Sequence, residues 1–519
     1  MIDGSMQEFA LTLDRFLLHA AKWHPDAEVV SARGDGGVDR VGYAALADRA
    51  RGVSGVLAGL GVGRGDRVAT LAWNSAAHVE AWYGVMGMGA VCHTLNPRLT
   101  AEQLAWMVGQ SEARVLIASA DLLPLAERIA AASPSIARVL TIDGPEGDPL
   151  EPMIAAAPRD VAWGDFAETS PSGLCFTSGT TGAPKGVTYT HRSGFLNTLR
   201  SLQVDGMAIS GGDRVLAVVP MFHANAWGLP FVTPAVGARL VLPGRHTDGV
   251  SLARLIAGEG VTVGVGVPTV WLGLIDHLDA TGAALPSLER VIVGGAALLP
   301  ALMERIESRL GVEVQTSWGM TELSPLGTIA PPRSATRDAT LSGRPAVGVD
   351  LLLTDADGRA LPEQRGVEGH LRVRGAAVVD RYFGQGASAT DDDGWFATGD
   401  LALIDERGNL RITGRAKDLI KSGGEWINPA EIEAIVGALP QVSLAAVIGR
   451  ADAKWGERPI LLVETCGHEE VSDDALRASL AGRVASWWMP DAIVRLPRMP
   501  LAATGKIDKL RLRADFGAA

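Results

Sequence analysis

Apolar and polar positions along the first 300 residues follow a recurring order of helix-like and strand-like segments. Residues 43–60 carry apolar side chains at helical spacing, and the apolar run 67–73 after the turn at 61–66 predicts a buried strand. The order recurs with a helix over 101–110 and a strand over 113–118, then with a helix over 251–257 and a strand over 261–265. This alternation predicts an α/β fold, in which helices cover mostly parallel sheets.

The pattern changes after about residue 340. Short alternating strands at 349–353, 369–374 and 409–415, separated by turn signals, predict a β-rich, barrel-like part that closes a large N-terminal domain. The charged segment 415–418 follows. We place the boundary there, so that 1–414 form the large domain and 419–519 form a small α+β C-terminal domain.

Composition and charge favour an ordinary globular enzyme. The chain has 519 residues, 47% hydrophobic and 20% charged, and a net charge of −12 that disfavours a nucleic-acid partner. Three dispersed cysteines, Cys92, Cys175 and Cys466, suggest neither a disulfide framework nor a metal cluster. The first 16 residues lack the apolar core of a signal peptide, and the apolar run 263–275 is shorter than the roughly 18 residues of a membrane span. A cytoplasmic protein without a membrane span is therefore expected.

The segment 177–186 holds the densest candidate chemistry. It follows the apolar strand-like residues 173–176 and combines hydroxyls, glycines and a lysine: Thr177, Ser178, Gly179, Thr180, Thr181, Gly182 and Lys185. Glycines let backbone N–H groups approach a ligand, and hydroxyls with a lysine complement polyphosphate charge. Pro184 before the lysine and Gly186 after it depart from the common P-loop. A polar turn after a strand is the alternative, but a phosphate loop of another family is favoured.

Four other segments carry chemistry that admits two interpretations each. The small residues at 294–297, two glycines and two alanines, line a pocket or form a tight turn. The segment from Trp318 to Glu322 offers a carboxylate suited to Mg²⁺ beside an aromatic ring that could equally be core. Asp400 at a strand end can accept both ribose hydroxyls or cap a turn. Lys506, on the turn 504–506, is by itself most simply a solvated charge.

The order and spacing of these segments resemble the adenylate-forming superfamily of acyl-CoA synthetases, adenylation domains and luciferases. The chain is most similar to medium- and long-chain fatty acyl-CoA ligases. The matching segments run in family order over nearly the whole length: 177–186, 220–227, 266–271, 293–296, 318–322, 398–400, 414–418, 421–427 and 504–506.

The resemblance implies a two-step reaction that uses ATP, Mg²⁺ and coenzyme A. A carboxylate attacks the α-phosphorus of ATP to give an acyl-AMP and pyrophosphate, and the thiol of coenzyme A then displaces AMP. It implies that residues 177–182 and Lys185 hold the β- and γ-phosphates, with Thr177 and Glu322 near Mg²⁺. The remaining nucleotide contacts that it implies are Thr321 on the α-phosphate, Gly295, Thr316, Ser317 and Trp318 at adenine, Asp400 and Arg415 at the ribose, and Lys417 beside them.

The resemblance also implies a mobile small domain. Lys506 would reach across to bridge the acyl carboxylate and the α-phosphate, with Glu322, Thr321 and His223 as further catalytic residues. Between the two steps the small domain would rotate about the hinge 415–418, with Lys417 as the pivot. The passage for coenzyme A would then be lined by Lys421, Gly423, Gly424, Glu425 and Trp426, whose paired glycines leave a narrow tunnel open.

The acyl site is expected at His223, Trp227, Gly295, Ala296 and Ala297. Trp227 gates the acyl tunnel or is ordinary core, and the small side chains leave space for an aliphatic chain. Medium-chain fatty acids are the first expectation, ahead of long-chain, aromatic and short thioether acids such as 3-methylmercaptopropionate. Trp318 and the Thr316–Ser317 pair depart from the Tyr and Gln-Gly often seen at the family's adenine site.

Other protein classes remain open on the sequence alone. An acyl-AMP ligase that loads a separate carrier protein shares the first step, and a luciferase-like oxygenase shares the scaffold. A non-catalytic nucleotide-binding protein is disfavoured because Lys185, Glu322, Asp400, Arg415 and Lys506 are all present. Related ligases often form homodimers through the large domain, which makes a homodimer an expectation here as well.

Overall fold

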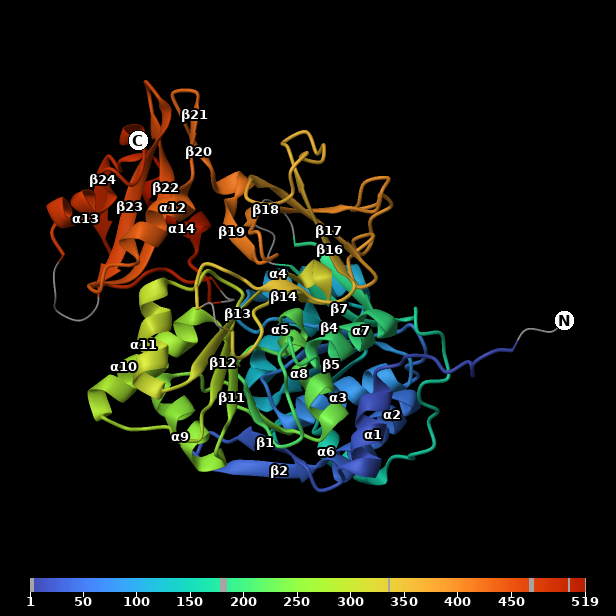
Figure 1. The fold of residues 1–519 in the computed structure, drawn as a ribbon. Coiled ribbons are helices and arrows are strands. Elements are labelled where there is room, and N and C mark those ends of the chain that lie inside the picture. Colours follow the sequence, from blue (N-terminus) through green and yellow to red (C-terminus); the bar gives the residue numbers. More distant parts are fainter. Residues whose placement is uncertain (1–3, 178–183, 335–336, 466–470, 503–504, 519) are drawn as a thin grey trace.

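The structure is a computed structural model that describes residues 4–177, 184–334, 337–465, 471–502 and 505–518. Figure 1 shows a large N-terminal domain and, above α10 and α11 of that domain, a smaller C-terminal domain coloured orange to red. This arrangement confirms the predicted fold class, a mixed α/β large domain followed by a small domain.

Within the described residues, the first sheet of the large domain has the strand order β6-β5-β3-β4-β7-β8. Its strands are β3 (Arg67–Leu71), β4 (Val91–Thr94), β5 (Val115–Ser119), β6 (Arg138–Ile142), β7 (Pro171–Phe176) and β8 (Gly186–Thr190). The helices in this part of the chain are α2 (Tyr43–Gly59), α3 (Ala76–Gly87), α4 (Ala101–Ser111), α5 (Leu123–Ala131), α6 (Leu150–Ala156) and α7 (His191–Ser201), with the 3₁₀ turn η1 (Ala120–Leu122). All strand pairs are parallel except β7–β8, as the alternating pattern predicted.

The second sheet has the order β15-β14-β13-β12-β11-β9-β10-β1-β2 within the described residues. Its strands are β1 (Glu28–Ala32), β2 (Val38–Gly42), β9 (Arg214–Ala217), β10 (Arg239–Leu242), β11 (Val263–Gly266), β12 (Arg290–Val293), β13 (Glu313–Gly319), β14 (Leu326–Ile329) and β15 (Arg344–Pro345). The helices are α1 (Asp14–Trp23), α8 (Leu229–Val236), α9 (Gly249–Glu259), α10 (Pro268–Thr281) and α11 (Pro300–Leu310), with the 3₁₀ turns η2 (Ala224–Gly228) and η3 (Thr321–Leu323). The predicted helix over 251–257 and strand over 261–265 are confirmed.

The two sheets share a hydrophobic core. Apolar residues of α2, α3 and α8 pack there with strands of both sheets, and the rings of Trp82 and Phe231 stack 6.0 Å apart. Beyond the end of β3, the buried Asn74 amide donates to the carbonyls of Ala217 and Val219, both at 2.9 Å, and accepts from the N–H of Met221. This side chain joins the carboxyl ends of the two sheets, the edge at which ligands bind in open α/β folds.

The part expected to be barrel-like is an antiparallel sheet in the order β16-β17-β18-β19. It consists of β16 (Val349–Thr354), β17 (Glu368–Gly375), β18 (Phe396–Ile404) and β19 (Leu410–Arg415), which confirms the three short strands predicted there. The register places Asp400 opposite Arg415.

The small domain packs helices on one further sheet, with the order β21-β20-β23-β22 and β24 paired to β23. Its strands are β20 (Ile420–Ser422), β21 (Glu425–Ile427), β22 (Val442–Asp452), β23 (Gly456–Thr465) and β24 (Ala492–Arg495). The helices are α12 (Pro429–Val436), α13 (Asp473–Leu480) and α14 (Lys509–Phe516), and the 3₁₀ turns are η4 (Ala416–Asp418) and η5 (Ser486–Trp488).

Close contacts hold the small domain on the large one. The Thr269 hydroxyl donates to the carbonyl of Gly505 at 3.2 Å, and a side chain at Gly437 would lie only 2.7 Å from a methyl group of Leu299. No helix in the described ranges combines the length and apolarity needed to cross a bilayer. Cys92 and Cys175 are buried free thiols.

Candidate functional site

The base of the predicted phosphate loop is the hairpin between β7 and β8. The N–H of Thr177 donates to the carbonyl of Lys185 at 2.9 Å, which closes the hairpin. Lys185 is exposed, and its ammonium lies 4.7 Å from the centroid of the Tyr382 ring. Residues 178–183 of the predicted loop lie outside the described residues, and they include five of the predicted phosphate contacts: Ser178, Gly179, Thr180, Thr181 and Gly182.

Glu322 lies in the turn η3, directly after β13. Thr321 and Glu322 are both buried, and the Tyr382 hydroxyl donates to Glu322 Oε1 at 3.0 Å. Burial raises the pKa of Glu322, while the Tyr382 hydrogen bond and the positive charges of Arg415 and Lys185 oppose that rise. The carboxylate is thus held among cations at the edge of a buried turn.

Trp318, Asp400 and Arg415 form a hydrogen-bonded group across two sheets. The indole N–H of Trp318 donates to Asp400 Oδ2 at 3.0 Å, and Arg415 Nε lies 2.7 Å from Asp400 Oδ1. Asp400 is almost fully buried, and burial raises its pKa against the stabilising Arg415 charge and Trp318 N–H. A carboxylate has about four acceptor positions, so two are left for a ligand after these contacts.

Lys506 enters this group from the small domain. Its side chain is exposed and lies within electrostatic range of this group. Burial and the charge of Arg415 lower the pKa of Lys506, while the carboxylates of Asp400 and Glu322 oppose that change. The hydrogen bond from Thr269 to Gly505 holds this turn on the large domain, and it leaves the C-terminal lysine within electrostatic range of Asp400, Glu322 and Arg415.

His223 and Lys417 lie within electrostatic range of the same group. Burial, together with the nearby Lys506 charge, lowers the pKa of His223 to about 4, so the imidazole is neutral near pH 7. Lys417, in η4, also has a pKa lowered by burial, and it interacts with the charges of Arg415 and Asp400.

Glycines and one tryptophan form the apolar side of the site. A side chain at Gly294 would meet Ser317 Oγ at 2.4 Å and the Trp227 ring at 3.1 Å, and Gly295 has a φ of +80°. Trp227 follows three further non-glycine residues in left-handed conformation, with φ between 45° and 54° over 224–227. Ala296 and Ala297 are exposed. The Trp227 indole therefore occupies part of the space that a side chain at position 294 would need.

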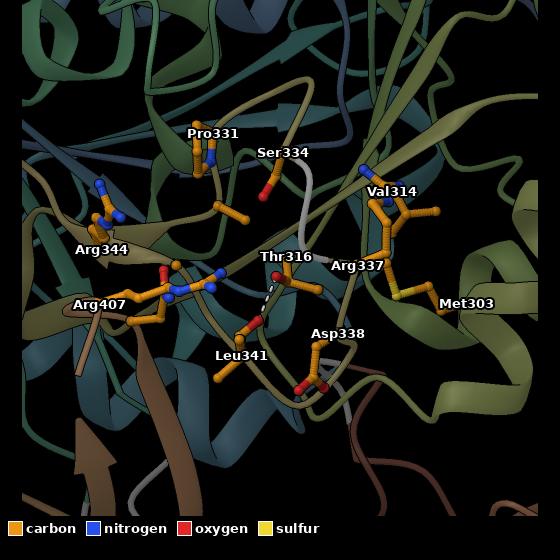
Figure 2. A pocket seen from close by; sticks show the side chains of 13 residues that line it. Met303, Val314, Thr316, Pro331, Ser334, Arg337, Asp338, Leu341, Arg344 and Arg407 are labelled. Carbon is orange, nitrogen blue, oxygen red and sulfur yellow. Dashed lines mark hydrogen bonds between the residues drawn. The ribbon is translucent and has the colours of Figure 1, made fainter. Parts of the chain in front are cut away.

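A cavity of about 230 Å³ borders this site at Thr316. Figure 2 shows the Thr316 hydroxyl donating to the carbonyl of Leu341, with Arg337 and Arg344 at the cavity's rim. Thr316 precedes Trp318 by two positions on β13, so their side chains share one face of the strand. The cavity thus adjoins the predicted adenine pocket, but its lining does not include the charged group around Lys506.

The predicted coenzyme A segment lies elsewhere. Lys421, Gly423, Gly424, Glu425 and Trp426 belong to the β20–β21 hairpin, which points away from the large domain in Figure 1. Trp426 is 54% exposed, and Lys421 Nζ lies 5.3 Å from the centroid of its ring. In this arrangement Lys506 faces the site and the hairpin does not.

Sequence reasoning missed three residues that hold the site together. Tyr382 contacts Glu322 and Lys185, Asn74 joins the strand ends next to His223, and the buried Arg200 donates to the carbonyl of Leu323 at 2.7 Å. These partners are 60 to 197 positions away in the chain, and no local pattern marks them. The sequence contains four tyrosines, and that scarcity was the one available signal for Tyr382.

The charges gathered around Lys506 suit a polyanion. Four cations (Lys185, Arg415, Lys417 and Lys506) face two carboxylates (Glu322 and Asp400), although the whole chain is acidic. No cluster of three or more metal-binding side chains is found within the described ranges. One carboxylate with the Thr177 hydroxyl fits a Mg²⁺ ion whose other ligands are substrate phosphates and water.

Comparisons with known proteins agree with this geometry. The AMP-binding enzyme model matches residues 17–383, and the AMP-binding enzyme C-terminal domain model matches 431–506. A 3-methylmercaptopropionyl-CoA ligase of Ruegeria lacuscaerulensis is 40% identical over 99% of this chain and 98% of its own length. A medium-chain-fatty-acid–CoA ligase of Ectopseudomonas oleovorans is also 40% identical, over 99% of this chain and 97% of its own.

A solved structure shows the same fold. The anthranilate CoA ligase AuaEII in complex with anthranoyl-AMP superposes with a TM-score of 0.89 at 25% identity, covering 98% of both chains. The two family models together match parts of both domains, and the two relatives and the solved structure each cover at least 98% of this chain. The chain therefore belongs to the AMP-binding enzyme family, and it is an AMP-forming ligase.

Proposed function

We propose that this protein is an ATP-dependent acyl-CoA synthetase that acts on aliphatic carboxylic acids, with medium-chain fatty acids preferred. The observation that carries the proposal is the position of Lys506, which follows the residue that Thr269 bonds across the domains and lies within electrostatic range of Asp400, Glu322 and Arg415. Such a cation can stabilise charge that develops while an acid attacks a nucleotide.

The residue roles follow from the charges and contacts. Asp400, held by Trp318 and Arg415, would accept the ribose hydroxyls, and Lys185 would hold the terminal phosphates. Lys506 would stand between the acyl carboxylate and the α-phosphate. Its lowered pKa would rise again on binding, because an anion stabilises the ammonium.

Glu322 and Thr177 are the residues that would hold Mg²⁺. When bound, the ion would offset part of the repulsion between the acid and the triphosphate. Glu322 is prepared for that task by Tyr382, whose hydroxyl keeps one carboxylate oxygen engaged. Thr321, beside Glu322 in η3, would bond the α-phosphate, and neutral His223 would line the approach of the acid.

The second step, thioester formation with coenzyme A, requires other residues to line the site. Because the β20–β21 hairpin lies outside while Lys506 lies inside, we propose that the observed arrangement serves acyl-AMP formation. Rotation about 415–418 would then withdraw Lys506 and turn the β20–β21 hairpin, residues 421–426, toward the site, where it would line the passage for coenzyme A. The boundary itself remains a prediction, supported by the end of β19 at Arg415 and the start of β20 at Ile420.

The apolar side of the site supports an aliphatic acid. Trp227 packs over Gly294 and Gly295, and Val267 lies 3.3 Å from where a side chain at Gly295 would stand. The medium-chain-fatty-acid–CoA ligase that is 40% identical supports the same choice. A short thioether acid is the second candidate, because the 3-methylmercaptopropionyl-CoA ligase has the same identity.

A panel of acids tests the proposal. We expect AMP formation with ATP, Mg²⁺ and coenzyme A to be fastest, as kcat/KM, for hexanoate to decanoate, with 3-methylmercaptopropionate next. Each added methylene that is buried contributes about 0.8 kcal/mol, so the rate should rise with chain length up to the end of the pocket. A higher kcat/KM for benzoate or a dicarboxylate would contradict an aliphatic pocket. Product formation only with a carrier protein would instead identify an acyl-AMP ligase.

Replacement of Trp318 by Phe tests the ribose contact. Phenylalanine keeps an aromatic ring at this position, but Asp400 loses the indole N–H that orients it. Because a hydrogen bond to a charged group contributes about 1.5–3 kcal/mol, we expect the preference for ATP over 2′-deoxy-ATP, measured as the ratio of kcat/KM, to fall about tenfold. An equal loss for both nucleotides would show that Trp318 does not act through Asp400.

Two wider proposals follow the family resemblance. We propose a cytoplasmic location, since the substrates ATP and coenzyme A are intracellular metabolites. A homodimer through the large domain is proposed as well, and a light-scattering mass of two chains would support it.

A further inference from the structure

Tyr382 contacts two charged residues that come from different strands of the large domain. Its hydroxyl donates to Glu322 Oε1 at 3.0 Å, and the face of its ring lies 4.7 Å from the ammonium of Lys185. Glu322 follows β13 of the second sheet, whereas Lys185 precedes β8 of the first. One side chain therefore touches both groups.

Backbone hydrogen bonds fix the segment that carries Tyr382. The N–H of Val379 donates to the carbonyl of Glu322, and the N–H of Phe383 donates to the carbonyl of Gly186, both at 2.8 Å. Gly186 also packs closely on Phe383, since a side chain at this glycine would lie 2.9 Å from Phe383 Cβ. Residues 379–383 thus form a strap that joins the end of the phosphate loop to the turn carrying Glu322.

The ring keeps Lys185 near Glu322 without pairing them. No ion pair between these two side chains occurs in the structure's described part, although Lys185 is near enough to lower the pKa of Glu322. An ammonium is attracted to the face of an aromatic ring, so the Tyr382 ring can hold the Lys185 side chain in place. This contact leaves the N–H groups of Lys185 available to a ligand. The hydroxyl at the other end occupies Oε1, which leaves Oε2 of the carboxylate for a metal ion.

We propose that Tyr382 is a positioning residue that couples the magnesium carboxylate Glu322 to the phosphate lysine Lys185, an inference that rests on the proposed function. Its hydroxyl holds the carboxylate in the orientation that binds the metal ion, and its ring holds the ammonium where the terminal phosphates arrive. Partners that orient a metal ligand in this way are typically responsible for 10- to 100-fold in metal affinity.

Two variants separate the hydroxyl from the ring. Tyr382→Phe keeps the ring beside Lys185 and removes the bond to Glu322, whereas Tyr382→Leu removes both contacts. The measurement is calorimetric binding of α,β-methylene-ATP, which cannot be cleaved at the α-phosphorus, to the full chain in EDTA and in Mg²⁺. The ratio of the two affinities is the Mg²⁺-dependent gain, and it does not depend on turnover.

We expect Tyr382→Phe to reduce the Mg²⁺-dependent gain about tenfold and to leave binding in EDTA unchanged. Tyr382→Leu should show the same loss of gain and, in addition, about threefold weaker binding in EDTA, the scale of an exposed cation–π contact. Tyr83→Phe is the matched control, because it removes a tyrosine hydroxyl bond, to the Pro230 carbonyl at 2.9 Å, elsewhere in the large domain. It should leave both affinities as in the wild type.

Two results would overturn the inference. An unchanged Mg²⁺-dependent gain in Tyr382→Phe would show that the hydroxyl does not orient the metal carboxylate. Equal weakening in Tyr382→Phe of the affinities measured in EDTA and in Mg²⁺ would show that Tyr382 only supports the fold. If the wild-type protein itself bound the nucleotide no better with Mg²⁺ than without it, the proposed function would fail together with this inference.

Discussion

Lys506→Ala should reduce acyl-AMP formation about 100- to 1,000-fold while leaving thioester formation from preformed acyl-AMP nearly unchanged. The magnitude is that of removing one fixed donor aimed at developing negative charge. The structure gives a reason for the selectivity, because Lys506 lies among Asp400, Glu322 and Arg415 in the arrangement that we assign to the first step. In the rotated arrangement the lysine would leave the site, so the second step would not depend on it.

The two half-reactions can be measured separately. Exchange between labelled pyrophosphate and ATP in the presence of octanoate reports the first, and a single turnover of synthetic octanoyl-AMP with coenzyme A reports the second. Lys22→Ala, at an exposed lysine of α1 in the large domain, is the control for the loss of one positive charge. A similar loss in both half-reactions would contradict the role assigned to Lys506.

Lys417→Pro should have the opposite selectivity and slow thioester formation on the order of 10- to 100-fold more than adenylation. Lys417 lies in the 3₁₀ turn η4, whose typical φ a proline can adopt, so the observed arrangement should tolerate the substitution. A rotation that needs a different φ at this residue would be opposed. The cost would be about 3 kcal/mol, as for a proline in a backbone conformation that it cannot adopt.

The neighbouring residue explains why the rotation should concentrate at Lys417. Asp418 forms an ion pair with Arg513 of α14 at 2.8 Å, which ties the chain just beyond the pivot to the body of the small domain. Lys417→Ala is the matched control, since it removes the same charge and leaves φ free. If the proline and alanine variants behaved alike in single-turnover measurements of both half-reactions, the loss would come from the charge and the pivot would have to lie elsewhere.

Much of the local structure was predictable from the sequence because it depends on near neighbours. Helical spacing over 43–60 and the apolar run after the turn at 61–66 correspond to α2 and β3, since amphipathic periodicity specifies both the element and its buried face. The candidate residues were also found locally, because a phosphate loop, a carboxylate after a strand and a lysine on a glycine turn each depend on a few consecutive positions.

The sequence by itself thus determined the elements, their order and the residue types that the chemistry requires. Only the tertiary structure decided which of them meet: Trp318 bonds Asp400 across 82 positions, and Tyr382 bonds Glu322 across 60. Such pairs follow from strand order and register, which depend on how separate sheets pack and not on neighbouring residues. The same holds for the two domains, because contacts between Gly505 and Thr269 place Lys506 inward and leave the β20–β21 hairpin outside.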